Sequence, residues 1–159
     1  MMDAHVHGTR AVICAAAAIM LAAGCGGPQV QVFTNPEADL SFYERVGVVP
    51  FRSLAADRLA GEKFTTEFTT ALLASELFEV VDYGIFVSHV TKILGTRSPA
   101  EGLSADEIKQ VAAAAGVQGL FVGTVSEYQM TSTPGGQFPV VTVEVRLLDA
   151  ETANVVWSA

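Results

Sequence analysis

After the N-terminal region, which is treated below, the first short run of hydrophobic residues is 45–51 (RVGVVPF). A Val-rich run of this length is typical of a buried strand, and Pro50 should end its ladder of hydrogen bonds. The pattern then changes to helical spacing over residues 57–77. The apolar stripe of this predicted helix should face the core, and its members are Phe64, Phe68, Leu72, Leu73 and Leu77.

The middle of the chain repeats the alternation of strand and helix. Residues 78–83 (FEVVDY) predict a second strand, and residues 85–94 favour a helix. After a loop, Ser104 and Glu107 have the spacing of a capping box, in which the two side chains cap the start of a helix. This second helix should end at Gly116, because glycine readily adopts the left-handed conformation that closes a helix.

The last part of the chain predicts three strands joined by turns. The strand patterns are residues 117–130, 140–148 and 155–157, and the turns fall at 133–136 and 150–154. The order of elements predicts a mixed α/β fold, a two-layer or three-layer sandwich. In it a parallel βαβ unit is followed by an antiparallel β-meander on the same sheet. The last pattern stops at Ala159, which leaves open a truncated domain that continues beyond this residue.

The start of the chain has a different pattern. Residues 11–23 form an unbroken apolar run of 13 residues, with Arg10 just before it. A membrane-spanning helix needs about 20 residues, so the run fits the apolar part of a secretory signal peptide. Small residues and then Cys25 follow the run, and they resemble a bacterial lipobox. In lipoproteins with this motif the cysteine becomes the first mature residue and carries the lipid; an ordinary cleaved signal peptide is the alternative.

These features divide the chain into three parts. Residues 1–24 are expected to be a lipoprotein signal peptide, residues 25–41 a lipidated N-terminus and tether, and residues 42–159 the α/β domain. Lipid on Cys25 would anchor the protein stably, because lipoproteins of this type carry at least two acyl chains. By the sorting rule that the resemblance implies, Gly26 in place of Asp favours the outer membrane, at its periplasmic face.

Composition and charge narrow the classes of function. The chain has 159 residues, of which 50% are hydrophobic, and this indicates one folded domain rather than a disordered chain. Its 9 Lys and Arg against 17 Asp and Glu give a net charge of −8, which argues against nucleic acid as a partner. Cys14 lies in the predicted signal peptide. With Cys25 lipidated, the domain has no thiol for a disulfide, a metal or a nucleophile.

Candidate catalytic residues are few. His89 is the one histidine after the predicted signal peptide, and Asp82 and Ser88 lie close to it in sequence. Closeness in sequence does not establish a triad, so a structural role is favoured for His89. No group of His, Asp and Glu has the spacing of metal ligands. We therefore expect no enzyme activity, no cofactor, no metal and no small-molecule substrate.

Two further features have structural and functional interpretations. Gly116, Gly119 and Gly123 follow a helix and enter a strand, the reverse of the order in a phosphate-binding loop, so close packing of helix on strand is favoured. Trp157 should pack in the core, and an exposed aromatic edge for a partner is the alternative. An open edge at the last strand would also accept a partner's strand.

Four segments follow one another behind the lipobox: VGVVPF, FEVVDYG, AAAAGVQGLFVGTVSEY and VRLLDAETANVVWS. In this order they resemble the curli-secretion lipoprotein family (CsgG type). They also resemble its relatives, the penicillin-binding-protein activator lipoproteins and the TolB amino-terminal-like domain. The resemblance covers residues 44–159. The Thr-Gly turn of the family is replaced here by Thr152-Ala153, and Asn154 can adopt the left-handed conformation instead.

The resemblance implies a non-enzymatic outer-membrane lipoprotein that acts through protein contacts, including self-association, in envelope assembly or secretion. The alternative is a regulator that docks on a periplasmic enzyme such as a peptidoglycan synthase. Curli-type pores insert long hairpins into the membrane, and such a hairpin needs about 20 residues. The 11 residues between Tyr128 and Val140 are too few, which favours the regulator over a pore. A periplasmic hydrolase would need a polar cluster that the sequence does not show.

Overall fold

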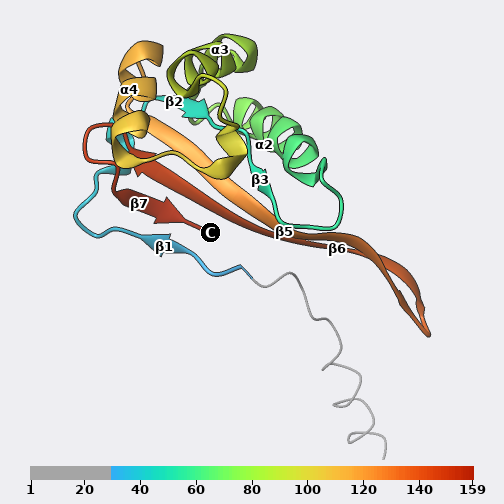
Figure 1. Cartoon of the computed structure of the whole chain (residues 1–159). Helices are drawn as coiled ribbons and strands as arrows, with labels where there is room; N and C mark the ends of the chain where they lie inside the picture. The colour runs from blue at the N-terminus through green and yellow to red at the C-terminus, as the bar shows by residue number, and fades with distance from the viewer. Residues whose placement is uncertain (1–29) are drawn as a thin grey trace, which may run out of the picture. The chain divides into compact units, whose positions relative to one another are not determined.

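A seven-stranded mixed sheet forms the centre of the domain, in the order β1-β7-β6-β5-β2-β4, with β3 beside β5 (Figure 1). The computed structural model describes residues 30–159, so the predicted signal peptide and Cys25 lie outside the described residues. The strands are β1 (Phe33–Thr34), β2 (Arg45–Val48), β3 (Arg52–Ser53), β4 (Glu79–Val80), β5 (Gly119–Thr133), β6 (Gly136–Asp149) and β7 (Val155–Ser158). Strand β2 is parallel to β4 and β5, whereas β5, β6, β7 and β1 pair antiparallel. The predicted mixed α/β fold is confirmed.

Helices cover both faces of this sheet. They are α2 (Ala60–Ser75), α3 (Tyr83–Leu94) and α4 (Ala105–Ala115), with the short 3-10 turns η1 (Leu40–Phe42) and η2 (Pro99–Glu101). Successive residues of a strand point to opposite faces, and Leu120 packs with α3 and α4 whereas Phe121 packs with α2. The domain is therefore a three-layer sandwich, which decides between the two architectures that the sequence left open.

The ends of the elements follow the local sequence signals. Strand β2 ends at Val48, two residues before Pro50, as predicted. Asp82 begins α3 by accepting a hydrogen bond from the Ile85 N–H at 3.0 Å. The capping box at α4 is present, and Gly116 ends that helix in the left-handed conformation at φ 65°. These signals are local, so the sequence alone was sufficient to place them.

The apolar stripe of α2 is shorter than predicted. Phe64, Phe68 and Leu72 pack against the sheet, but Leu73 and Leu77 are exposed, so their place in the stripe is wrong. Leu73 follows Leu72 directly and therefore lies about 100° around the helix from it. Glu76 adopts a left-handed conformation at φ 55° and ends the helix, which leaves Leu77 outside it.

Two other differences concern segments without a periodic pattern. The sequence predicts a tether up to residue 41, whereas Phe33 and Thr34 pair with Trp157 and Ser158 of β7. This pairing covers the edge of β7 that the sequence left open for a partner. In the β6–β7 turn Ala153, rather than Asn154, takes the left-handed conformation, at φ 60°.

The glycines at the start of β5 allow close packing, but not against a helix. A Cβ on Gly119 would come within 3.0 Å of the Tyr43 ring, and one on Gly123 would overlap the Phe51 ring. Phe51 itself stacks edge-on against Phe64 of α2, with ring centroids 5.1 Å apart. Because Gly119 and Gly123 have no side chain, the rings of Tyr43 and Phe51 can lie directly against the backbone of β5.

Candidate interaction surface

The candidate catalytic residues do not form a site. His89 is half-buried on α3, and both neighbours considered for a triad bind the backbone of Ile85: Asp82 accepts from its N–H, and Ser88 donates to its carbonyl oxygen at 2.6 Å. Among residues 30–159, no three His, Cys, Asp or Glu side chains are grouped so that they could hold a metal ion. Over the same range, no helix combines the length and the hydrophobicity needed to cross a membrane.

An apolar groove opens on the α2 face of the sheet, between α2 and the segment that contains η1. It has a volume of about 290 Å³. Its lining is wholly hydrophobic, namely Leu40, Phe68, Leu72, Leu77, Phe78, Phe121, Leu147 and Trp157. The groove exists because α2 is the one helix described on this face and contacts β3, β4 and β5, leaving β6 and β7 partly uncovered.

Exposed apolar residues lie on or next to α2 and η1, the two elements that border the groove, and one of them, Leu77, lines it. The exposed fraction is 75% for Leu77 and 55% for Leu73, and Phe42 on η1 is also exposed. Single exposed apolar residues are common on proteins, but several around one apolar groove mark a binding surface. The predicted stripe included Leu73 and Leu77 but expected both to face the core, because periodicity cannot tell where a helix stops covering its sheet.

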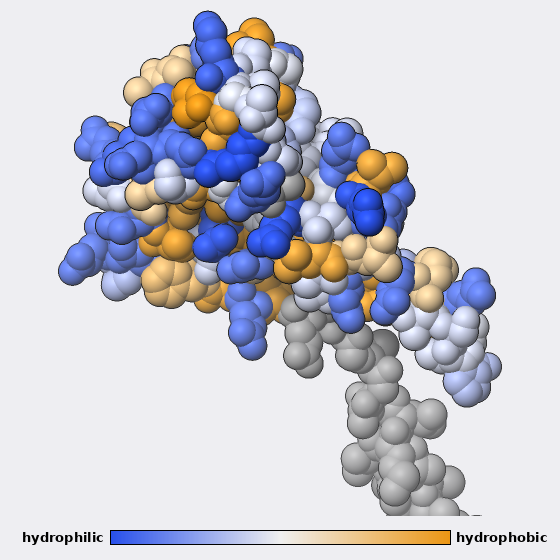
Figure 2. All heavy atoms as spheres, in the orientation of Figure 1, coloured by the Kyte–Doolittle hydropathy of each residue, from blue (hydrophilic) through white to orange (hydrophobic). Residues whose placement is uncertain are grey.

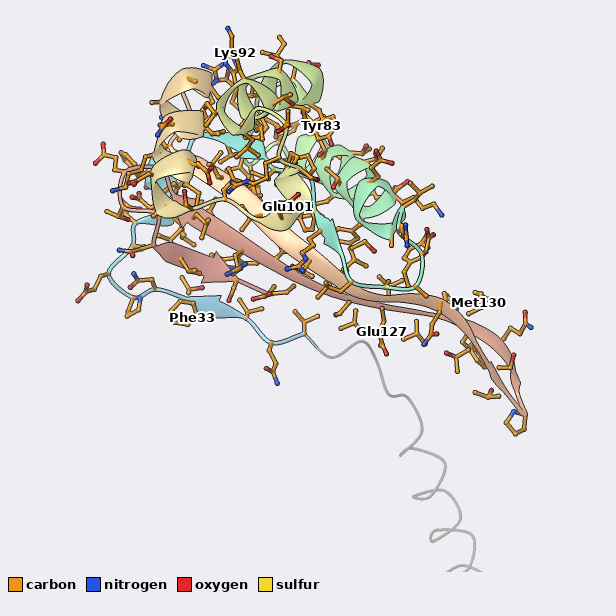
Figure 3. All side chains as sticks on the ribbon, in the orientation of Figure 1. Phe33, Tyr83, Lys92, Glu101, Glu127 and Met130 are labelled. Atoms are coloured by element: carbon orange, nitrogen blue, oxygen red, sulfur yellow. The ribbon has the colours of Figure 1, made fainter. Side chains whose placement is uncertain are left out.

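The hairpin formed by β5 and β6 carries a second apolar surface. Its outer half runs past the other strands (Figure 1), and Figure 3 shows Met130 farther out than Glu127. Tyr128 pairs with Val141, and Met130 pairs with Pro139, so these four side chains share one face. We call them the hairpin face. It continues the row of Val145 and Val143 that packs under α2.

An ion pair lies beside the hairpin face. Lys63 of α2 donates to Asp57 Oδ2 at 2.7 Å, and its Nζ lies 5.4 Å from the centre of the Tyr128 ring. The hydrogen bond from Lys63 lowers the pKa of Asp57 and, reciprocally, raises the pKa of Lys63. The contact of the Lys63 cation with the Tyr128 ring links α2 to the hairpin face, and Met130 is 60% exposed.

The surface over α3 and α4 differs in polarity from the α2 side of the sheet. Hydrophilic residues dominate the part of Figure 2 over α3 and α4, and hydrophobic residues are more frequent along the lower edge, near β1 and β7. The groove and the hairpin face, in contrast, are apolar and lie on the α2 side. Such a surface can bind another protein through hydrophobic contact.

The comparison with known proteins rests on structure, since no protein-family model and no curated protein matches the sequence. Lipoprotein GNA1162 from Neisseria meningitidis is 19% identical at a TM-score of 0.59, over 73% of this chain and 78% of the other. The C-terminal domain of LpoB from Escherichia coli is 16% identical at a TM-score of 0.53, over 89% and 90% of the two chains.

The domain shares its fold with LpoB. It shares the same fold with PelC from Paraburkholderia phytofirmans, whose crystals contain a dodecamer: 21% identity and a TM-score of 0.54, over 81% of this chain and 78% of the other. The penicillin-binding-protein activator part of the expected resemblance therefore agrees with the fold, and the CsgG part stays a prediction. At these identities the likeness concerns the fold.

Trp157 combines the two roles that the sequence left open. Its ring packs edge-on against Phe121, with centroids 6.4 Å apart, so it belongs to the core on the α2 side. The same ring lines the apolar groove and is half-buried there. The aromatic character of the residue pointed to both roles, but the groove depends on Leu40 and Leu77, which no local pattern brings to the same place.

Proposed function

We propose that the protein is a non-enzymatic lipoprotein of the bacterial envelope that regulates a periplasmic enzyme by docking on it. The enzyme class is a peptidoglycan synthase, as the resemblance to the penicillin-binding-protein activator lipoproteins implies. A lipid on Cys25 would hold the protein at the periplasmic face of the outer membrane. One observation carries the proposal: the fold that the domain shares with LpoB presents here an apolar groove and an apolar hairpin face on the same side of the sheet.

A docking experiment tests this function. The full chain, purified from membranes in mild detergent, is added to purified bifunctional peptidoglycan synthases of the same organism, and glycan polymerisation is measured. We expect the wild type to change the rate. Leu77→Glu should weaken docking more than about tenfold, because it places a charge in the apolar contact. Ile85→Glu, an exposed apolar residue on α3, is the matched control and should act like the wild type.

The anchor has its own test. Cys25→Ala should release the protein from the membrane fraction into the soluble periplasmic fraction, because the acyl chains can no longer be attached. Retention of Cys25→Ala in the membrane would contradict lipidation at this position. A wild type that leaves every synthase unaffected would contradict the regulatory function, whatever the result for the anchor.

A second candidate function is assembly into a ring in envelope secretion. The dodecamer of PelC, which has the same fold, favours it. The native mass of the detergent-extracted wild type separates the two candidates. A discrete oligomer would support the ring, and a monomer that binds a synthase would support the regulator.

A further inference from the structure

A second cavity lies on the face of the sheet that carries α3 and α4, opposite the apolar groove. It is a cleft of about 320 Å³ bounded by η2, the start of α4 and strands β3, β5 and β6. Such a volume falls at the lower end of the range for small-ligand sites. Most of its wall is aliphatic and includes Val49, Leu103, Ile108, Val122, Leu148 and Val155.

Two arginines line this cleft, and no acidic residue does. Arg52 of β3 pairs with Thr124 of β5, and Arg146 of β6 pairs with Val122 of β5, so both arginines point to the same face. They flank β5 at two strand spacings, and Arg146 lies two residues along the sheet from the Arg52–Thr124–Glu144 row, so their Cα atoms are about 12 Å apart. Arginine side chains are long enough for both guanidinium groups to reach one anion at this separation.

The cationic groups of the cleft are incompletely neutralised. Arg146 Nε is buried without a hydrogen-bond partner, although the side chain as a whole is 40% exposed, and Glu144 Oε1 lies 3.6 Å from this atom. That separation permits an ion pair but is too long for a hydrogen bond. Among residues 30–159, Arg52 makes no ion pair. A buried donor without a partner is costly, and an anionic ligand would supply the missing acceptor.

We propose that this arginine cleft binds a carboxylate that carries a small aliphatic group. The charges of Arg52, Arg146 and the adjacent Glu144 sum to +1, which matches one carboxylate better than a doubly charged phosphate. The aliphatic wall accommodates the apolar group, and Thr124 adds a hydroxyl donor. Glu101, on the turn in front of β5 (Figure 3), accepts the Ser98 N–H at 3.4 Å and does not line the cleft.

Nuclear magnetic resonance titration of the ¹⁵N-labelled full chain in mild detergent tests the proposal. The probes are 4-methylpentanoate, its neutral amide, and a short peptide that ends in leucine with a free carboxylate. Millimolar 4-methylpentanoate should shift the amide signals of Gly123, Thr124 and Val155, and its amide should not. Tighter binding of the peptide would identify a polypeptide C-terminus as the source of the carboxylate, and tighter binding of the free acid would identify a small molecule.

Variants locate the binding. Arg146→Gln and Arg52→Gln should each weaken binding about tenfold, the effect of losing one charge-assisted hydrogen bond. Arg58→Gln, an exposed arginine outside the cleft, should not. Glu144→Gln should strengthen binding by freeing Arg146, whereas Glu67→Gln on α2 should leave it unchanged. Equal binding of the acid and the amide, shifts outside the cleft, or unchanged affinity in both cleft variants would overturn the proposal.

Discussion

Thr65 is the one buried polar residue found among residues 30–159, and its hydroxyl connects α2 to the sheet. It donates to the Gly61 carbonyl oxygen at 2.7 Å and accepts from the Phe51 N–H at 2.9 Å. Thr65→Val keeps the shape but leaves the buried Phe51 N–H without an acceptor. We expect a loss of about 1–3 kcal/mol in the free energy of unfolding, measured by urea denaturation.

Thr66 offers a matched control for this prediction. Its hydroxyl also bonds back four residues along α2, to the Glu62 carbonyl oxygen at 3.1 Å, but the side chain is exposed. Thr66→Val should therefore change the free energy of unfolding by less than about 0.5 kcal/mol. Equal losses in the two variants would show that the Phe51 hydrogen bond contributes nothing to stability.

Glu107 makes the stability of the domain depend on pH. The Ser104 backbone N–H, the Arg97 guanidinium and the Ser104 hydroxyl hold its pKa at about 2, below the ordinary value of 4.5. Because the folded-state pKa is the lower one, this stabilisation is complete above the ordinary pKa and disappears as the pH falls toward 2. Urea midpoints between pH 6 and pH 2 should fall less in Glu107→Gln than in the wild type; Asp106→Asn is the control.

At the scale of elements, the long hairpin should be separable from the core. Beyond the Glu127–Thr142 pair, its strands contact mainly each other. Replacing residues 128–141 by Asn-Gly, a sequence suited to a tight hairpin turn, should change the free energy of unfolding by less than about 1 kcal/mol. The same variant should lose docking on a synthase if the hairpin face takes part. A shortened protein that fails to fold would show that the hairpin belongs to the core.

The elements also show how far the sequence determines the fold. Helix α4 follows from a local signal, the capping box, and was predictable. The Pro-Gly-Gly turn places the tip of the β5–β6 hairpin, but the sequence predicted strands only to residue 130 and from residue 140, whereas β5 continues to Thr133 and β6 begins at Gly136. Strand β1 was not predictable, because Phe33 and Thr34 acquire their structure from a partner more than 120 residues later in the chain. The groove and the arginine cleft were missed for the same reason, since each joins side chains from separate elements.

At the scale of the whole molecule, the sheet separates two surfaces of different chemistry. The apolar groove lies on the α2 face, and the arginine cleft lies on the face with α3 and α4. Changes at sites this far apart usually combine additively. We therefore expect saturating 4-methylpentanoate to leave docking on a synthase unchanged, and Leu77→Glu to leave carboxylate affinity unchanged. Calorimetry with both ligands present measures this, and a shift of more than about threefold in either affinity would reveal coupling.

The pairing of β1 with β7 has a mechanical consequence. With a lipid on Cys25, tension between the membrane and a docked partner would act first on β1, which holds the sheet edge by two residue pairs. Peeling it away would free the chain as far as Tyr43, whose buried ring and hydrogen bond to Asp149 at 3.0 Å resist further unravelling. The ten residues released span at most about 35 Å when fully extended, so the reach of the protein would grow by less than this length. Detachment and re-pairing of β1 would then let the protein adapt to different distances between the membrane and its partner while the core of the domain stays folded.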